Sequence, residues 1–538
     1  MKRVLIIIGA VILVLALIIG FLALPRTSNE FDIVYDQEKI KAKEAFLAEK
    51  DTDTSQNRPN IIVIVADDLG KTDLALYGNT ITETPNIDRL GAEGTVFNEG
   101  YVTAPICSPS RAGLLTGRYQ QRFGYELQPV NRYLKSRLES IVVNSTFDLQ
   151  QLEFADNQKV PTKEAIEKQG LPLQEITLAD LLRKNGYATA IIGKWHQGFS
   201  KEFLPLQRGF DYHYGFYEAF SWFADTTNPD IINVRHKGIM DSFIWKNGGS
   251  GLSQKKRNAV DIDVKEFYTY ALANEAVQYI EKNKDKPFFL YVPFNAPHTP
   301  FQALKSEVKR YQDKGVTDLN KAVYYALITG LDSAIGQINN KIKDLGLEEN
   351  TLVFFISDNG GATYTHATDN ASLKGGKMSL YEGGINVPFI VKWKGIVPAN
   401  KVNNQLVNSV DIFATAAAIS GSKLPNDRLY DGVNLIPHLI GKDSASIHQV
   451  LFWRSGYNKA IRKGEWKLVL NLKDNITALY HLKVDKSETT NLASKLPIKL
   501  QELKTDLETW EKGLVKPLWP SNGFFKNNID GNVDRFTL

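Results

Sequence analysis

The side chain with the most distinctive chemistry in this sequence is Cys107, the only cysteine among 538 residues. It opens the segment CSPSR (residues 107–111), which lies in a tract of glycine, threonine and arginine. A disulfide needs a second cysteine, and thiolate metal sites usually use several sulfur ligands, so neither explains this thiol. Two interpretations remain, namely a small buried apolar residue and a residue with a catalytic role.

Polar side chains follow four predicted strands, at the point where each strand ends. These residues are Asp67, Asp68, Lys194, His196, His298, Asp358 and Asn359, with Lys377 a short distance further along the chain. In open α/β sheets, functional groups gather beyond the carboxyl ends of the strands. The sequence therefore predicts that five separate segments deliver these groups to one rim of a sheet.

The acidic members of this set indicate a metal site. Adjacent carboxylates such as Asp67 and Asp68 repel one another, and a solvated turn at the strand end is the alternative interpretation. Together with Asp358 and Asn359 they form an all-oxygen ligand set, and a cation would relieve the repulsion. Hard oxygen ligands suit calcium or magnesium rather than zinc. Because calcium tolerates the irregular geometry of a site assembled from distant segments, we expect calcium.

The basic members suit an anion. Histidines are often structural and lysines are often surface charges, but an anion such as sulfate needs fixed cations around its peripheral oxygens. Lys194 and Lys377 meet that need if they reach the same rim. Arg111 lies four residues after Cys107, which is one turn away if a helix begins at the cysteine. The N-terminus of that helix would itself favour an anion.

The ordered set of motifs resembles the sulfatases and covers about residues 59–514. The motifs are C-x-P-x-R at 107–111 with TGR at 116–118, DDLG at 67–70 with YG at 77–78, GKWH at 193–196, PHTPF at 297–301, SDNG at 357–360, GGK at 375–377 and the closing segment at 479–493. One departure is Gln197, where the family usually has an apolar residue. We expect Gln197 to alter the wall of the pocket.

The resemblance implies that Cys107 is oxidised to formylglycine, whose hydrate attacks the sulfur of a sulfate ester. The implied calcium ligands are Asp67, Asp68, Asp358, Asn359 and the formylglycine at position 107. The implied catalytic residues are Cys107, Arg111, Lys194, His196, His298 and Lys377. In these roles the lysines hold the sulfate oxygens, Arg111 stabilises the hydrate, His298 protonates the leaving alcohol and His196 removes a proton to release sulfate.

The elements that must position these groups are predicted from runs of apolar residues. Continuous β-branched and aromatic runs predict buried strands, and helical patterns lie between them. The predicted strands are 60–66, 188–193, 287–293, 351–357 and 387–392, and the helices include 178–185 and 321–345. We therefore predict an α/β fold with a large mixed, mostly parallel sheet sandwiched by helices. Further along the chain, short strands at 449–453, 459–462, 466–470 and 478–481 precede a helix at 497–513. They predict a smaller C-terminal antiparallel sheet plus helix.

The chain exceeds the length that one hydrophobic core normally supports, so we expect two domains. The predicted catalytic domain is 59–420, and the smaller α+β domain is 421–538. A polar linker is predicted over 26–58, with a short solvated helix within 38–50.

Residues 1–25 are predicted to be a membrane anchor or signal segment. The uncharged run from 4 to 24 spans about 31 Å as a helix, close to the thickness of a bilayer core. It is longer than the apolar core of a signal peptide and lacks a clear cleavage site. We expect an uncleaved anchor, with a cleaved signal peptide as the alternative. Lys2 and Arg3 would stay cytoplasmic, and the body would be exported to the periplasm or the cell exterior.

The expected substrate is a sulfated polysaccharide or an oligosaccharide derived from it. Segment 201–256 is rich in aromatic and basic residues, which can stack on sugar rings and pair with sulfate. These residues are Phe203, Tyr212, His213, Tyr214, Trp222, Phe223, Arg235 and His236. The alternative is a packed loop that supports the core. The net charge of +4 argues against a nucleic-acid partner.

The resemblance also implies a maturation enzyme that generates formylglycine. Two other functions stay open at this level. One is a phosphonate or phosphate ester hydrolase, because related enzymes share the sheet and can share C-x-P-x-R. The other is a tethered protein that binds sulfated glycans without cleaving them, which would follow if Cys107 is never oxidised.

Overall fold

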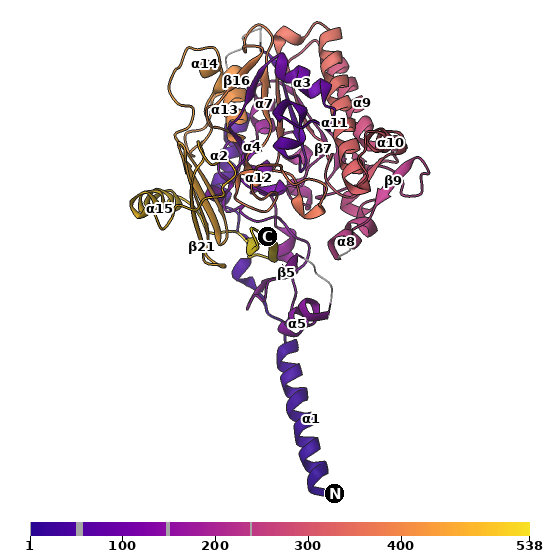
Figure 1. Cartoon of the computed structure of the whole chain (residues 1–538), viewed down its shortest axis with the longest axis vertical. Coiled ribbons are helices and arrows are strands. Elements are labelled where there is room, and N and C mark those ends of the chain that lie inside the picture. Colours follow the sequence, from indigo (N-terminus) through magenta and orange to yellow (C-terminus); the bar gives the residue numbers. More distant parts are fainter. Residues whose placement is uncertain (1, 50–57, 147–150, 237–238) are drawn as a thin grey trace.

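A central sheet runs through the body of the protein and carries helices on both faces (Figure 1). The computed structural model describes residues 2–49, 58–146, 151–236 and 239–538. Within these residues the sheet has ten strands. In spatial order they are β11 (Val260–Asp261), β10 (Lys256–Arg257), β8 (Tyr212–Phe216), β7 (Ala188–Lys194), β12 (Phe288–Pro293), β2 (Asn60–Ala66), β14 (Thr351–Ser357), β15 (Phe389–Lys392), β3 (Thr95–Phe97) and β16 (Lys401–Asn403). The five strands predicted from apolar runs are all present in it.

Side chains of the central strand β2 alternate between two cores. Ile62 and Ile64 join one hydrophobic cluster, and Ile61, Val63 and Val65 join the other. Because successive side chains of a strand point to opposite faces, an unbroken apolar run is what a strand covered on both faces requires.

Helices cover both faces of the sheet. One layer contains α3 (Pro85–Ala92), α9 (Tyr268–Asn283), α10 (Lys305–Asp313) and α11 (Leu319–Asp344). The other contains α4 (Cys107–Thr116), α7 (Leu178–Lys184) and α13 (Val410–Ile419). A capping box between Thr177 and Asp180 starts α7, and the Asp318 side chain caps α11. The predicted fold class is confirmed.

The register of the sheet aligns the carboxyl ends of its central strands. β2 pairs in parallel with β14 and β12, with Ala66 opposite Ser357 and Val65 opposite Pro293. The sheet is mixed, because β15 runs antiparallel to both β14 and β3. Residues that directly follow β2, β12 and β14 therefore emerge at one rim.

A four-stranded antiparallel sheet and one helix follow in the C-terminal part, as predicted. The strands are β18 (Val450–Ser455), β19 (Asn458–Lys463), β20 (Trp466–Asn471) and β21 (Ile476–His481), and the helix is α15 (Pro497–Glu511). A buried cation, Lys467, joins this sheet to the body by contacting Glu382 of α12 (Glu382–Ile385) at 2.8 Å and Glu488 at 2.9 Å.

A further sheet was not predicted. The terminal hairpin of β22 (Gly523–Ile529) and β23 (Asn532–Thr537) pairs with β5 (Leu152–Phe154). The remaining named elements are α5 (Arg137–Thr146), α6 (Lys163–Glu167), α8 (Ile239–Asn247), α14 (Leu435–Leu439), β1 (Thr27–Ser28), β4 (Gly100–Tyr101), β6 (Val160–Pro161), β9 (Ile231–Val234), β13 (Phe301–Leu304) and β17 (Val407–Asn408).

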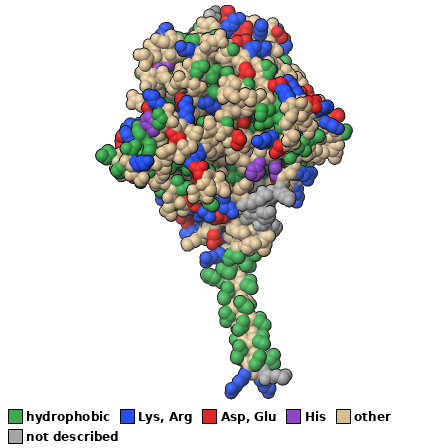
Figure 2. All heavy atoms as spheres, viewed as in Figure 1, with side chains coloured by type: hydrophobic (Ala, Val, Ile, Leu, Met, Phe, Trp, Pro, Cys, Tyr) green, Lys and Arg blue, Asp and Glu red, His purple; other side chains and the backbone are tan. Residues whose placement is uncertain are grey.

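The N-terminal helix α1 (Lys2–Ala23) projects from the body (Figure 1). Its mean hydropathy is 3.4 and none of its side chains is buried. Figure 2 shows apolar side chains along the projecting helix and cationic side chains at its tip. By length and composition α1 could cross a membrane, and an N-terminal signal sequence would have the same features.

Residues 26–49 of the predicted polar linker pack on the body instead of standing free. β1 pairs with β6, and Ile33 is buried beside Trp519. The predicted helix is present as α2 (Gln37–Ala48), but it is not solvated all round, because Lys43 is buried and contacts Asp180 at 3.0 Å. Residues 50–57 of the predicted linker lie outside the described part of the chain.

Candidate active site

The ten residues predicted for catalysis and metal binding lie at the rim formed by the carboxyl ends of β2, β7, β12 and β14. Each of them is buried. The loops after the strands are fastened by backbone hydrogen bonds, from Asp67 N to Ala296 O at 3.1 Å and from Asp358 N to Ala66 O at 3.0 Å. The structure therefore brings together side chains that are up to 310 positions apart in the sequence, from Asp67 to Lys377.

Cys107 is the first residue of α4, as the spacing to Arg111 requires. Its side chain is only 1% exposed, and Sγ lies 3.5 Å from Asp67 Oδ1 and 3.9 Å from Asp68 Oδ1. The helix approaches its neighbours closely because Gly113 has no side chain. A Cβ at that position would lie 2.3 Å from Thr103 Oγ1.

The unmodified Cys107 thiol is a poor nucleophile in this environment. Burial raises its pKa above the usual value, and the nearby cations of Lys194 and Lys377 offset that increase only in part. A thiol with a raised pKa stays protonated near neutral pH, whereas the thiolate is the reactive form.

Each of the three carboxylates at the rim contacts a cation. Lys194 Nζ lies 2.7 Å from Asp67 Oδ2, and Lys377 Nζ lies 2.8 Å from Asp68 Oδ1. Arg111 binds Asp358 through Nε at 2.8 Å and through its terminal nitrogen at 2.7 Å. Paired charges of this kind are what permit ionic groups inside a protein.

The pKa values of Asp67 and Asp68 reflect these ion pairs. Burial would raise the pKa of Asp67, but Lys194, His298 and Arg111 lower it below its usual value. Burial likewise opposes ionisation of Asp68, whose pKa is nevertheless lowered by Lys377 and His298. Both groups are therefore ionised near neutral pH, which a role in binding a cation requires.

The donor atoms at the rim can hold a metal ion, and the carboxylate and amide oxygens among them suit a hard divalent cation. Ligand atoms of Asp67, Asp68, Cys107 and His298 all lie within 4.8 Å of one another. Asn359 donates its amide to Asp68 Oδ1 at 2.8 Å, while its buried Oδ1 has no hydrogen-bond partner among the described residues. Buried polar atoms are nearly always satisfied, so this unpaired oxygen points to a missing ligand.

The compact group differs from the predicted ligand set in two respects. It contains His298, and it lacks Asp358, which directs one oxygen to Arg111 and accepts a hydrogen bond from Asp68 N at 3.2 Å with the other. Asp358 and Asn359 nevertheless lie beside this group, because each is hydrogen-bonded to Asp68.

Two histidines face this cluster. Nε2 of His298 lies 3.6 Å from Asp68 Oδ2, and its Nδ1 lies 2.5 Å from the carbonyl oxygen of Thr299. Burial lowers the pKa of His298, and Lys377 lowers it further, while Asp68 raises it in part. The pKa of His196 is well below its usual value because of burial and the charges of Lys194 and Arg111. His196 is therefore neutral near pH 7.

Backbone strain marks the same rim. Asp68, His196 and Met378 adopt positive φ angles of 64°, 55° and 62°. Side chains rarely adopt this left-handed conformation, and such strain is found preferentially at functional sites.

Gln197 does not line a pocket wall, contrary to the expectation from the sequence. It is fully buried, and its Nε2 donates to Ser108 O at 2.8 Å and to His196 O at 2.9 Å. Ser108 donates its hydroxyl to His196 O at 2.6 Å. Gln197 and Ser108 thus connect the first turn of α4 to the His196 loop. Ser108 was missed in the sequence because the serine side chain itself carries no distinctive signal, even within the CSPSR segment.

Segment 201–256 is largely a packed support, so the prediction of sugar stacking is wrong for several of its residues. Phe203, His213, Tyr214 and Phe223 are buried. His236 is half-buried and bonds to Asn320 at 2.8 Å. Aromatic side chains of β8 contribute to the core because α9 packs against this strand, while the β10–β11 hairpin extends the sheet beside it. Residues 237 and 238 of this segment lie outside the described residues.

Comparisons with known proteins agree with this geometry. The family model described as Sulfatase matches residues 59–422. A dog N-acetylgalactosamine-6-sulfatase is 32% identical over 413 residues, which are 76% of this chain and 71% of that protein. An N-acetylgalactosamine-6-O-sulfatase of Bacteroides thetaiotaomicron is 28% identical over 535 residues and covers 86% of this chain and 94% of its own length.

A solved structure is similar over most of the chain. The crystal structure of Ps i-CgsB in complex with k-i-k-neocarrahexaose has a TM-score of 0.69 and 30% identity, and the match covers 86% of this chain and 94% of that one. The predicted fold and the predicted resemblance are therefore supported by sequence and structure alike.

Proposed function

Because this chain belongs to the sulfatase family, we propose that it removes sulfate from a sulfated carbohydrate with a formylglycine formed from Cys107 and a bound calcium ion. The observation that carries the proposal is the arrangement around position 107. Three buried carboxylates, each contacting a cation, lie within reach of one residue at the start of a helix.

In this proposal the cations of the chain bind the sulfate group. Lys194 and Lys377 hold its peripheral oxygens, and Arg111 orients Asp358 and the residue at position 107. Preorganised cations of this kind stabilise the charge that develops during transfer. The pKa of Lys377 is well above its usual value, because the attraction of Asp68 outweighs the effect of burial. Lys377 therefore remains a cation throughout the working pH range.

Formylglycine supplies, as its hydrate, an oxygen nucleophile and a second hydroxyl group whose deprotonation releases sulfate. Calcium, held by Asp67, Asp68, Asp358, Asn359 and residue 107, supplies positive charge that favours ionisation of that nucleophile. Oxygen donors and the unpaired Asn359 Oδ1 support calcium over zinc.

His298 and His196 serve two different proton transfers. Nε2 of His298 faces the rim and can deliver a proton to the leaving oxygen when the ring is an imidazolium whose Nδ1–H is held by Thr299 O, and the Lys377 cation can assist it. His196 is neutral and can accept a proton, which suits the base that completes the release of sulfate. Gln197 and Ser108 position the backbone between His196 and the start of α4.

The carbohydrate substrate is supported by the named relatives. Two of them are N-acetylgalactosamine sulfatases, and the similar solved structure holds a neocarrahexaose. A sulfated polysaccharide or oligosaccharide is met outside the cytoplasm, which agrees with an apolar N-terminal helix. We propose an exported enzyme in the periplasm or at the cell exterior, anchored by residues 1–25 and matured by a formylglycine-generating enzyme.

The proposed division into domains follows the sheets. Residues 59–420 hold the large sheet and the site, and 421–538 hold the smaller antiparallel sheet with α15. The terminal hairpin belongs to the second part, yet it contacts the rim, since Asn527 donates to Met378 O at 2.6 Å.

The test replaces residue 107. Wild-type protein from a host that forms formylglycine should release sulfate from a panel of monosaccharide sulfates and sulfated polysaccharides, measured by ion chromatography. Cys107→Ala should release none, and Cys107→Ser should either stop after forming a sulfated enzyme or show no turnover. Unchanged melting temperatures would show that both variants fold. Full turnover by Cys107→Ser would contradict the proposal.

The same assay separates the other candidate functions. Faster turnover of aryl phosphonates or phosphates than of every sulfate ester would favour the phosphonate or phosphate hydrolase. Tight binding of sulfated glycans without any turnover, in protein whose Cys107 is unmodified, would favour the tethered binding protein.

A further inference from the structure

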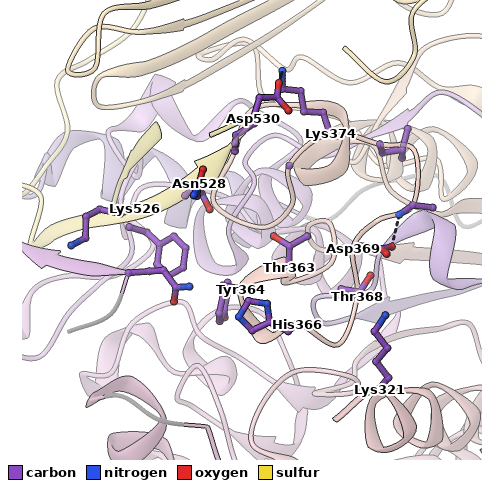
Figure 3. A pocket seen from close by; sticks show the side chains of 17 residues that line it. Lys321, Thr363, Tyr364, His366, Thr368, Asp369, Lys374, Lys526, Asn528 and Asp530 are labelled. Carbon is purple, nitrogen blue, oxygen red and sulfur yellow. Dashed lines mark hydrogen bonds and ion pairs between the residues drawn. The ribbon is translucent and has the colours of Figure 1, made fainter. Parts of the chain in front are cut away.

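A cavity of about 580 Å³ lies between the loop at residues 363–375 and the terminal strand β22 (Figure 3). This volume lies within the range of small-molecule sites, roughly 300–1,000 Å³. Its walls come from the segment after β14, from β22 and from the start of α11. We call it the hairpin pocket, because β22 belongs to the terminal hairpin.

One wall of the hairpin pocket is a loop whose neighbours in the sequence belong to the reaction centre. Asp358 and Asn359 precede this loop, and Lys377 follows it. Tyr364 of this loop packs on Phe525 of β22 with ring centroids 5.0 Å apart. The same hydrophobic cluster contains Ile106 and Met378, the chain neighbours of Cys107 and Lys377. Tyr364 therefore joins the wall of the hairpin pocket to residues next to Cys107 and Lys377 in the sequence.

Three basic side chains line the hairpin pocket without an acidic partner within 4 Å among the described residues. These are Lys321 of α11, His366 of the loop and Lys526 of β22 (Figure 3). Figure 3 shows Lys321 and Lys526 at different ends of the pocket, with His366 between them. By contrast, Lys374 is engaged by Asp530, by Tyr480 and by Glu488 O.

Two of these basic residues occupy locally unfavourable positions. Lys321 lies in the first turn of α11, where the helix dipole disfavours a cation. His366 has a φ of +59°, a conformation that non-glycine residues rarely adopt. Departures from local preference are expected where a residue serves recognition.

The charge balance of the hairpin pocket favours an anion. Lys321 and Lys526 carry two positive charges, and His366 offers a ring that donates a hydrogen bond. The acidic lining residues are Asp530, which Lys374 engages, and Asp369, which accepts a hydrogen bond from the Ala371 amide at 2.9 Å. Lys321, His366 and Lys526 thus face the cavity without acidic partners, whereas Asp369 is the one lining carboxylate without a cation partner among the described residues.

We propose that the hairpin pocket binds the sugars next to the one that loses its sulfate, and that these sugars carry anionic groups of their own, which Lys321 and Lys526 meet at the two ends of the pocket and His366 meets between them. The proposal rests on the proposed function and narrows the substrate to a glycan with charge on adjacent sugars. Sulfate and carboxylate share the required chemistry, namely several oxygen acceptors for charged donors. The half-buried ring of Tyr364 gives the sugar ring a surface to pack against.

The experiment compares matched oligosaccharides. Each carries one sulfate on the terminal sugar, and the following sugars are neutral hexoses, sulfated hexoses or hexuronates. The measured quantity is the ratio of kcat/KM for a charged neighbour to kcat/KM for the neutral neighbour. The ratio should fall about tenfold in Lys321→Gln and in Lys526→Gln, because each loses one charge-assisted contact. The better charged substrate identifies whether the natural group is sulfate or carboxylate.

The control variant is Lys394→Gln. Lys394 follows β15, far from the rim, and it is exposed and pairs with Glu348 at 3.0 Å. Its replacement changes the net charge by the same amount as each pocket substitution, but it should leave the ratio of kcat/KM values unchanged. If wild-type protein shows no preference for a charged neighbour, or if the ratio is the same in all four proteins, the proposal is overturned.

A binding measurement separates this proposal from the proposed function. Titration calorimetry with Cys107→Ala needs no turnover, and the added substitutions Lys321→Gln and Lys526→Gln should each weaken binding of the charged oligosaccharides about tenfold. Lysine-dependent binding in this background, together with no sulfate release by wild-type protein from a host that forms formylglycine, would overturn the proposed function alone. Sulfate release without lysine-dependent binding would overturn the hairpin pocket assignment alone.

Discussion

Among single residues, Gln197 shows how a buried polar side chain can prepare an active site without touching the substrate. Its Nε2 donates to two backbone carbonyls, one at the first turn of α4 and one at the strained His196. An apolar side chain at this position would leave both carbonyl oxygens with fewer hydrogen bonds. A buried acceptor that loses its donor costs about 1–3 kcal/mol.

We predict that Gln197→Leu lowers kcat by about tenfold at a temperature where the variant is folded, because a loss of about 1.4 kcal/mol in positioning corresponds to that factor. KM should change less, since the cations that bind sulfate stay in place. The matched control is Gln121→Leu, which removes a buried amide that donates to Arg454 O at 2.7 Å. Equal kcat in Gln197→Leu and wild type, at equal conversion of Cys107 to formylglycine, would refute the positioning role.

Among the elements, the buried group of Lys467, Glu382 and Glu488 holds the C-terminal sheet against α12. Glu488 also accepts a hydrogen bond from Glu382 N at 2.7 Å. Since α12 closely follows Lys377, this group braces the loop that supplies a cation to the site. The pKa of Glu488 is raised to about 7, because burial, which Lys467 opposes and Glu382 reinforces, disfavours its charged form.

This shift has a definite consequence for stability. Glu488 holds its proton more tightly in the folded protein, so its contribution is present at low pH and is lost as the pH rises through about 7. We predict that the free energy of unfolding falls between pH 5 and pH 8 by an amount on the order of 1–3 kcal/mol from this group, at about 1.4 kcal/mol per pKa unit. Urea unfolding of Glu488→Gln should show a smaller fall over the same range. An identical fall in both proteins would show that Glu488 does not titrate in this interval.

The elements also show what could be predicted from the sequence. The central strands were predictable because β2 and β14 are continuous apolar runs, which only a doubly covered strand tolerates. The residues after those strands were predictable as a cluster, because parallel strands end at one rim. The terminal hairpin was missed, although Asp530-Gly531 between β22 and β23 is a hairpin signal.

Side-chain exposure was the least predictable property. The aromatic residues of segment 201–256 have the composition of a sugar-binding surface, yet the packing of α9 on β8 buries most of them. The basic residues of the hairpin pocket come from α11, the 363–375 loop and β22, which lie far apart in the sequence. Only the folded topology brings them together, so composition alone could not identify them.

For the molecule as a whole, the position of α1 bears on where the enzyme works. Residues that follow α1 are tied to the body, with Arg26 contacting Asp156 at 2.6 Å and β1 pairing with β6. The active body would therefore stay close to a membrane that holds α1.

We predict that full-length protein remains in the membrane fraction after washing with high salt, and that a chain lacking residues 1–25 is recovered in the soluble fraction. Sulfate release per molecule should be equal in the two proteins within about twofold, because none of the α1 side chains is buried in the body. Recovery of the full-length gene product in the soluble fraction, with its N-terminus beginning near residue 25, would instead identify a cleaved signal peptide.

The central claim is that position 107 carries an aldehyde-derived nucleophile beside ionised carboxylates. The most direct measurement is mass spectrometry of the tryptic peptide spanning residues 90–111, from active protein made in its own host. Oxidation of Cys107 to formylglycine should lower the peptide mass by about 18 Da. Fully active protein in which this peptide retains the unmodified cysteine mass would contradict the account.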